Sequence, residues 1–165
     1  MEDEVDRLVA AWRRERPDLD VEPLEVLSRV SRLARHLDRA RRLAFAEHDL
    51  EPWEFDVLTA LRRAGGTYQL SPGQLLTQTL VTSGTMTNRI DRLAKRGLVE
   101  RQPDPNDRRG VLVRLTEAGK RHADAALAGL LVQERALLGG LSAAERQQLG
   151  GLLRALTAPF DNLPA

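Results

Sequence analysis

Apolar residues recur at helical spacing in the first third of the chain and predict two helices. The first stripe consists of Val5, Leu8, Val9 and Trp12. Pro17 ends this short helix, because a proline inside a helix removes a backbone hydrogen bond. The second stripe consists of Val26, Val30, Leu33, Leu37, Ala40 and Ala44. It predicts a helix of about six turns from Pro23 to about Ala46, preceded by a separate helical extension over residues 1–20.

Proline, glycine and capping residues delimit two shorter helices in the middle of the chain. Pro52 opens the first of them, and the paired glycines at positions 65 and 66 end it. Its inward residues are Phe55, Leu58 and Leu61. Ser71 and Gln74 form a capping-box pattern at the start of the second, with Pro72 at its first helical position. Its buried residues are Leu75, Leu76 and Leu80.

A tight turn from Leu80 to Ser83 leads into a further helix that runs from about Ser83 to Arg96. Gly97 stands at its C-terminal end. The residues expected to be buried are Met86, Ile90, Leu93 and Ala94. The outward face then carries Thr85, Asn88, Arg92 and Lys95.

Beyond Gly97 the apolar pattern changes from a helical period to a period of two. This predicts a strand from Leu98 to Arg101, a turn-rich loop over residues 102–110 and a returning strand over residues 111–115. The result is a β-hairpin with a basic tip.

Two apolar helices follow the hairpin. Thr116 caps the first, which breaks at the glycine pair 139–140, and Ser142 with Glu145 forms a capping box for the second. The apolar residues of the first are Ala123, Leu127, Leu130, Leu131 and Leu138. Those of the second are Leu149, Leu152, Leu153 and Leu156.

Two short helices joined by a tight turn and followed at once by a hairpin form the order of a winged helix-turn-helix. The sequence therefore predicts a mainly α chain with a small β-hairpin, whose DNA-binding domain spans residues 51–115. In this arrangement the helix that starts at Ser83 enters the major groove of duplex DNA. The hairpin tip, with arginines on a projecting turn, fits a narrow minor groove.

The candidate DNA-binding residues share an exposed position on this helix or at the hairpin tip. They are Ser83, Thr85, Thr87, Asn88, Arg92, Lys95, Asp107, Arg108 and Arg109. Guanidinium and ammonium groups meet phosphates or guanine edges, an asparagine amide pairs with adenine, and threonine reaches a phosphate or a thymine methyl group. The carboxylate of Asp107 can instead hold one of the two neighbouring arginines.

Charge is distributed unevenly along a nearly neutral chain. The formal net charge is +1, but residues 82–121 hold ten Lys or Arg against five acids, whereas residues 1–22 hold eight acids against four arginines. A basic segment on a neutral protein suits phosphate binding, although a solvated charged face gives the same pattern.

Composition excludes several classes of protein. The absence of cysteine rules out disulfides, thiolate metal sites and cysteine nucleophiles. The acidic N-terminal residues do not form a secretory signal, and the longest uncharged stretch is too polar to span a bilayer, so we expect a cytoplasmic protein. No pairing of histidine with carboxylate at metal-ligand spacing involves His36, His48 or His122, so neither a metal nor a cofactor is expected.

Residues 83–120, SGTMTNRIDRLAKRGLVERQPDPNDRRGVLVRLTEAGK, resemble the recognition helix and wing of MarR-family regulators. The resemblance includes the D-x-R wing motif of the family at Asp107 and Arg109. MarR proteins dimerise through their first and last helices, which implies a dimerisation region here over residues 21–50 and 116–165. It also implies a homodimer that binds a palindromic site, most simply as a repressor.

The leading WRRERPDLD, together with FDVLTALRRAG and TNRIDRL, resembles the urate-responsive, PecS-like branch of that family. That branch has an extra N-terminal helix, and its anion site uses a tryptophan, an aspartate and two arginines. The matching positions are Trp12, Asp56, Arg89 and Arg101. Their chemistry suits a planar anion such as urate, because arginines attract the charge, an aromatic ring covers the face and a carboxylate accepts ring N–H groups.

Each of these four residues has a simpler interpretation. Trp12 lies on an apolar stripe and can be a packing residue. Asp56 can lie exposed or form an ion pair with Arg89 or Arg101, and Arg89 can be a plain phosphate contact. Two other functions therefore stay open: a DNA-binding regulator with no effector or with a different carboxylate or phenolic ligand, and an enzyme, for which we find no acid–base set.

Overall fold

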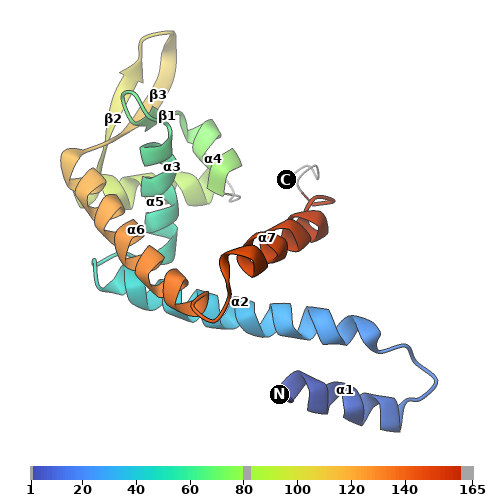
Figure 1. Ribbon diagram of the computed structural model, residues 1–165. Helices are drawn as coiled ribbons and strands as arrows, with labels where there is room; N and C mark the ends of the chain where they lie inside the picture. The colour runs from blue at the N-terminus through green and yellow to red at the C-terminus, as the bar shows by residue number, and fades with distance from the viewer. Residues whose placement is uncertain (1, 80–82, 161–165) are drawn as a thin grey trace. The chain divides into compact units, whose positions relative to one another are not determined.

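The computed structural model describes residues 2–79 and 83–160, apart from the side chains of Ser83 and Arg108. It is mostly helical with one small antiparallel sheet, as the sequence predicts (Figure 1). The chain divides into two compact units, residues 1–41 and 42–165. None of the helices within the described ranges is long and apolar enough to cross a membrane.

The N-terminal unit pairs α1 (Glu4–Glu15) with the greater part of α2 (Glu22–Ala46). Asp3 caps α1 by accepting hydrogen bonds from the backbone N–H groups of Val5 and Asp6 at 2.7 and 2.9 Å. Only a few apolar residues are buried between the helices, namely Val5, Val9 and Val21, with Leu24 packed against them. So small a core contributes little hydrophobic stabilisation. The two helices are also joined by a network of several charges, which constrains their register more than an isolated exposed pair does.

A ladder of ion pairs joins α1 to α2. Arg29 binds both Asp3 and Asp6, at 2.9 and 2.6 Å, and Arg32 binds Glu4 at 2.5 Å. The hydrogen bond from Arg29 is the main reason that the pKa of Asp3 falls to about 2. These carboxylates are therefore ionised at neutral pH and hold the helices in register.

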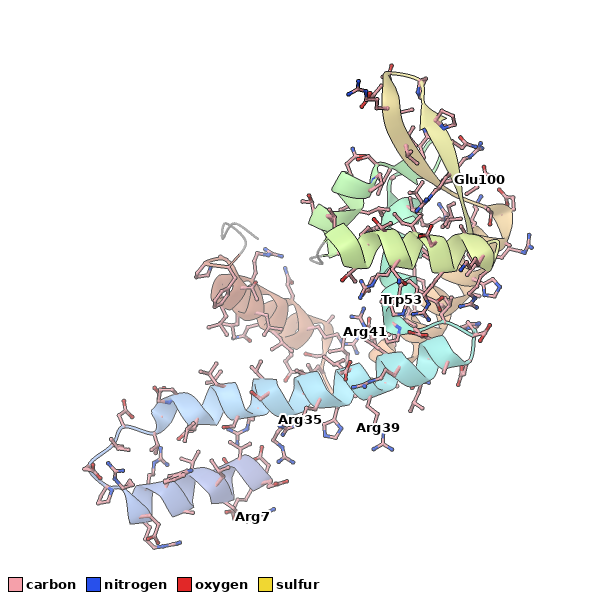
Figure 2. The ribbon with its side chains drawn as sticks, turned by 180° about the vertical axis from the view of Figure 1, so that it is seen from behind. Arg7, Arg35, Arg39, Arg41, Trp53 and Glu100 are labelled. Atoms are coloured by element: carbon pink, nitrogen blue, oxygen red, sulfur yellow. The ribbon has the colours of Figure 1, made fainter. Side chains whose placement is uncertain are left out.

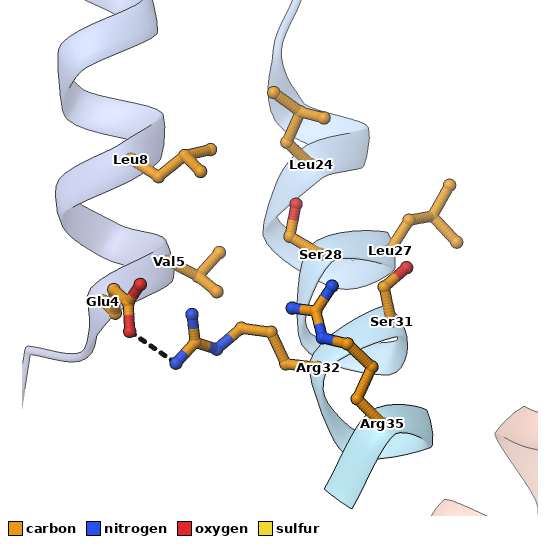
Figure 3. Close-up of a pocket in the computed structure, with 9 residues that line it drawn as sticks. All are labelled: Glu4, Val5, Leu8, Leu24, Leu27, Ser28, Ser31, Arg32 and Arg35. Carbon is orange, nitrogen blue, oxygen red and sulfur yellow. Dashed lines mark hydrogen bonds and ion pairs between the residues drawn. The ribbon is translucent and has the colours of Figure 1, made fainter. Parts of the chain in front are cut away.

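A groove of about 310 Å³ lies between these two helices (Figure 3). Leucine and valine side chains line it, and Arg32 and Arg35 reach toward it from α2. Arg32 is already paired with Glu4, so Arg35 is the cation at the rim with no ion pair among the described residues.

The second unit contains the sheet and the main core. Its helices are α3 (Pro52–Arg63), α4 (Pro72–Thr79), α5 (Ser83–Lys95), α6 (Glu117–Leu137) and α7 (Ala143–Thr157). Its strands are β1 (Gln69–Leu70), β2 (Val99–Asp104) and β3 (Asp107–Leu115). The sheet has the order β1-β3-β2 and every pairing is antiparallel, with Gln69 opposite Arg114 and Val99 opposite Leu115.

The predicted helix boundaries in this unit are confirmed by their caps. The side chains of Ser71 and Gln74 each accept a hydrogen bond from the other residue's backbone N–H, and Thr116 accepts one from the N–H of Gly119. Ser142 and Glu145 form the predicted capping box of α7. The predicted turn from Leu80 to Ser83 lies outside the described residues.

The sheet differs from the sequence prediction at two points. The turn-rich loop predicted over residues 102–110 is almost entirely strand, because β2 and β3 continue pairing to Asp104 and Asp107 across a register irregularity at Pro103. The two-residue strand β1 was not predicted. It is too short to show an alternating pattern, and its pairing with β3 is what places it in the sheet.

The core of the second unit brings together all of its elements except α7. Its most deeply buried large side chains are Phe45, Leu58, Leu61, Leu75, Met86, Ile90 and Leu93. The rings of Phe45 and Phe55 stack with centroids 4.0 Å apart. This core holds α5 and the β2–β3 hairpin on one rigid base, while α7 buries none of its residues.

Candidate nucleic-acid interface

Helix α5 has one buried and one exposed face. Met86, Ile90 and Leu93 are at most 1% exposed and fix the helix on the core. The opposite face is polar and exposed and carries Thr85, Thr87, Asn88, Arg92 and Lys95. The predicted division of α5 is therefore confirmed, with Ala94 half-buried at the boundary. The side chain of Ser83, also predicted to lie on the exposed face, is outside the described part.

The β2–β3 hairpin projects from the helices of its unit and has a short, tightly folded tip (Figure 1). Asp104 accepts a hydrogen bond from the backbone N–H of Asn106 at 2.8 Å, and Asp107 accepts one from the backbone N–H of Arg109 at 2.9 Å. Asp107 thus holds the backbone of Arg109, whose side chain is exposed. The side chain of Arg108 lies outside the described set.

Gly110 is required by the close approach of the two strands at this tip. A Cβ atom at position 110 would lie 2.8 Å from the Cβ of Asp104 and 3.0 Å from that of Asp107. The glycine therefore allows the Asp107 turn to close and to present the guanidinium of Arg109 at the end of the hairpin.

Trp53, labelled in Figure 2, lies near the start of α3 and contacts two arginines of α5. The guanidinium carbon of Arg92 lies 4.7 Å from the centroid of its indole ring, and that of Arg89 lies 5.4 Å away. The indole N–H donates to the carboxylate of Glu51, which also accepts a hydrogen bond of 2.8 Å from Arg92. These donors, the indole first, lower the pKa of Glu51 from its ordinary value, so that it is ionised at neutral pH.

These side chains line a hollow of about 500 Å³ on the exposed face of α5. Its lining consists of Glu51, Trp53, Gly84, Thr85, Asn88, Arg89 and Arg92. It therefore combines an aromatic face, two guanidiniums, an amide and a hydroxyl with the carboxylate of Glu51, beside the backbone of α5. The guanidiniums, the amide and the hydroxyl are groups that contact base edges in DNA.

Arg96 fixes α5 to the elements before it. Its guanidinium donates to Glu54 at 2.6 Å and to the backbone and side-chain oxygens of Asp49 at 2.6 and 2.7 Å. The side chain of Glu54 is only 2% exposed. Arg96 is therefore a structural cation, whereas Lys95 and Arg109 take part in no ion pair among the described residues and are available to phosphates.

Comparison of the chain with known proteins identifies its family. A model of the MarR family matches residues 48–110. The HTH-type transcriptional regulator PecS of Dickeya dadantii is 43% identical over 116 residues, which cover 70% of each chain. The chain belongs to the MarR family.

Further relatives of this MarR-family chain agree. The HTH-type transcriptional repressor NicR of Pseudomonas putida is 34% identical over 66% of this chain and 70% of its own length. The structure of a MarR mutant from E. coli complexed with operator DNA matches with a TM-score of 0.67 and 31% identity, covering 84% of this chain and 99% of that one. The predictions of a winged-helix fold and of a DNA-binding transcriptional regulator rather than an enzyme are thus confirmed.

The four residues predicted to bind an anion are distributed over different parts of this MarR-family chain. Trp12 is on α1 of the N-terminal unit and is 47% exposed. Arg89 faces Trp53, and Arg101 on β2 pairs with Asp91 at 2.8 Å. Asp56 lines a smaller hollow of about 200 Å³, with Thr59, Arg63, Gln78 and Thr79. Their joint role in ligand binding stays a prediction.

Sequence reasoning missed Glu51, Trp53 and the pairing of Glu54 with Arg96. Trp53 and Glu51 precede the apolar stripe of α3, and they reach α5 only because the fold brings position 53 beside positions 89 and 92. The spacing of Arg89 and Arg92 was a usable signal, because residues three apart share a helix face and can contact the same neighbouring side chain.

Proposed function

We propose that this chain is a ligand-responsive MarR-type repressor that binds palindromic duplex DNA as a homodimer and is released by a small planar anion such as urate. The exposed polar face of α5 carries the proposal, because a rigid helix with threonine, asparagine and arginine side chains suits the major groove. The hairpin tip adds Arg109 for the neighbouring minor groove. The related MarR mutant from E. coli was solved in complex with operator DNA, which supports DNA binding by a chain of this fold.

Exposed apolar residues support the homodimer. Helices α2 and α7 carry large apolar side chains that are between 37% and 59% exposed, namely Val26, Leu27, Val30, Leu33, Leu152, Leu153 and Leu156. Apolar surface of this extent in a soluble regulator indicates a protein interface. A two-fold dimer with two copies of α5 requires half-sites about one helical turn apart, which is the basis for a palindromic operator.

Similarity to PecS supports the anionic effector, with Trp12, Asp56, Arg89 and Arg101 as its binding residues. Arg89 lies on α5 itself, and Arg101 lies on the strand that leads to the wing. An anion that draws either guanidinium away from its present partner would shift the DNA-reading elements.

A regulator without a small-molecule site, or with a different carboxylate or phenolic ligand, is the second candidate. One observation favours it: Arg101 is already paired with Asp91, and Arg89 already lies over Trp53. A ligand has to compete with these internal partners.

A titration of DNA binding at fixed salt, with and without urate, separates the two candidates. The salt concentration must be held constant because phosphate contacts make affinity strongly salt-dependent. Release by urate and not by an uncharged purine, abolished by Asp56→Asn, supports the effector site. Tight binding that urate leaves unchanged supports the second candidate. A Lys120→Gln variant, altered outside the proposed DNA-binding and effector residues, serves as the control.

A further inference from the structure

The Arg92 guanidinium on the exposed face of α5 is held on two sides by residues of α3 and its N-cap. Its Nη2 donates to Glu51 at 2.8 Å, and its carbon lies 4.7 Å from the centroid of Trp53. The indole N–H of Trp53 donates in turn to Glu51, so the three side chains form a closed set. Arginine has five N–H donors, and in the described structure Glu51 occupies one of them.

The two residues that hold Arg92 are themselves fixed. Glu51 is the N-cap of α3, and its backbone N–H donates to the buried carboxylate of Glu54 at 2.9 Å. Trp53 is half-buried and packs against the core of the unit. Neither residue is on α5, so the position of the guanidinium is set by a second element and not by the rotamer preferences of α5 alone.

This arrangement is poorly explained as a stabilising ion pair. The side chains of Arg92 and Glu51 are 52% and 55% exposed, and exposed pairs contribute little to the free energy of unfolding. Its effect lies in geometry: a guanidinium held by a carboxylate and an indole loses little further side-chain freedom when it forms two hydrogen bonds elsewhere. The carboxylate of Glu51 also offsets the charge of the Arg92 guanidinium, which makes a neutral base edge a better partner for it than a phosphate.

We propose that Glu51 and Trp53 are positioning residues of the DNA-reading surface, which orient the Arg92 guanidinium toward a guanine edge in the major groove. This inference rests on the proposed function of α5. The pairing of arginine with guanine O6 and N7 uses two parallel N–H donors, and the orientation of the fork then decides specificity. Asn88 lines the same hollow and lies one turn away on the same helix face, where it reads a neighbouring base.

Two roles for Glu51 predict opposite effects of removing its charge on DNA binding. If Glu51 were a latch that keeps Arg92 from DNA, removing its charge would raise the affinity for the operator. If Glu51 positions Arg92, removing its charge lowers the preference for the operator over unrelated DNA. It does so without lowering the affinity for unrelated DNA, because a negative charge has been removed from the interface.

Selection of duplexes from a randomised pool, followed by anisotropy titrations at fixed salt, tests this inference. The wild-type chain is first used to define a preferred duplex. We expect Arg92→Ala and Glu51→Gln to relax the preference at the same guanine position, each by about tenfold. We expect Trp53→Leu to do the same and Trp53→Phe, which keeps a ring face but loses the indole N–H, to have a smaller effect. Arg92→Lys should keep the salt dependence and lose the guanine preference.

Glu47→Gln is the matched control, since it removes one exposed carboxylate from the same unit that does not line the hollow on α5. A Glu51→Gln variant that gains operator affinity, keeps the wild-type preference or relaxes it at a position different from that of Arg92→Ala would overturn the inference. Unfolding of each variant in urea checks that the fold is intact. If the wild-type chain selects no sequence at all, the proposed function itself fails, which is a different result from selection that Glu51→Gln leaves unaltered.

Discussion

At the scale of single residues, the buried carboxylate of Glu54 joins α3 to the residue that follows α5. Glu54 lies in the core-facing part of α3 and accepts hydrogen bonds from Arg96 and from the backbone N–H of Glu51. Burial of an ionised group is costly unless it is paired, so the fold depends on Arg96 to balance the charge of Glu54. The hydrogen bond to Glu54 also raises the pKa of Arg96 above its ordinary value.

Arg96→Met should therefore destabilise the chain by about 3 kcal/mol, because it leaves the Glu54 carboxylate buried without its cation. Urea denaturation followed by circular dichroism measures this loss. Arg121→Met, at an exposed position of α6, should change the free energy of unfolding by less than about 0.5 kcal/mol. The double variant with Glu54→Met should recover part of the loss, and a double variant less stable than either single one would refute this account of Glu54.

At the scale of elements, α6 begins in close contact with the end of the turn after α5. Thr116 donates its hydroxyl to the carbonyl oxygens of Gly97 and Leu98 and accepts the N–H of Gly119. A Cβ atom at Gly119 would lie 2.0 Å from the carbonyl oxygen of Leu98. The first turn of α6 thus approaches the start of β2 so closely that only glycine fits.

Gly119→Ala should lower the free energy of unfolding by about 2 kcal/mol, because the backbone of β2 or α6 must shift to admit the methyl group. Gly150→Ala is the contrasting substitution, since α7 leaves open space around that position and alanine favours a helix by about 1 kcal/mol over glycine. Thermal unfolding of both variants measures the two changes, a lower melting temperature for Gly119→Ala and a higher one for Gly150→Ala. Equal effects from the two alanines would show that helix propensity, and not the contact with Leu98, dominates.

The α1–α2 pair should loosen in acid. The pKa of Asp3 is about 2 in the folded chain and 3.8 is its ordinary value, so this group stabilises the fold above pH 4 and its contribution is lost as the pH falls toward 2. Fluorescence of Trp12 in a Trp53→Phe background reports the change. Asp3→Asn should loosen the pair already at neutral pH. An unchanged signal for Asp3→Asn throughout this range would exclude the ion-pair ladder as the main constraint.

At the scale of the whole molecule, the exposed apolar residues of α7 are the feature that points to assembly with another chain. This helix buries none of its residues within the described chain, yet its leucines at 152, 153 and 156 form an apolar face. A helix with such a face is stable only when another surface covers it.

If the proposed homodimer forms through α7, Leu152→Glu together with Leu156→Glu should convert it to monomers and lower DNA affinity at least tenfold, because one monomer reads only one half-site. Analytical ultracentrifugation measures the mass, and an anisotropy titration measures the affinity. Gln147→Glu, which adds one charge on an exposed position of the same helix, should leave both unchanged. Dimers that persist in the double variant would place the interface elsewhere.

Sequence patterning predicted every helix of the described structure, since caps such as Ser71, Thr116 and Ser142 and breakers such as Pro17 and Gly97 act locally. It failed at β1 and at the length of the hairpin, where pairing between distant strands decides the structure. It predicted Arg92 and Asn88 on the exposed face of α5 from their spacing alone. It could not predict that Trp53 and Glu51 reach Arg92, because that contact depends on how α3 packs against α5.

Helix α5 and the hairpin are proposed to read a specific DNA sequence. The most direct measurement compares the affinity of the chain for its selected duplex with that for a shuffled duplex of equal length and composition, at one salt concentration. We predict a preference of at least about a thousandfold for the selected duplex, reduced by Asn88→Ala and Arg92→Ala more strongly than by Lys95→Ala. Equal affinity for the two duplexes, or a preference that the α5 substitutions leave unchanged, would contradict the account.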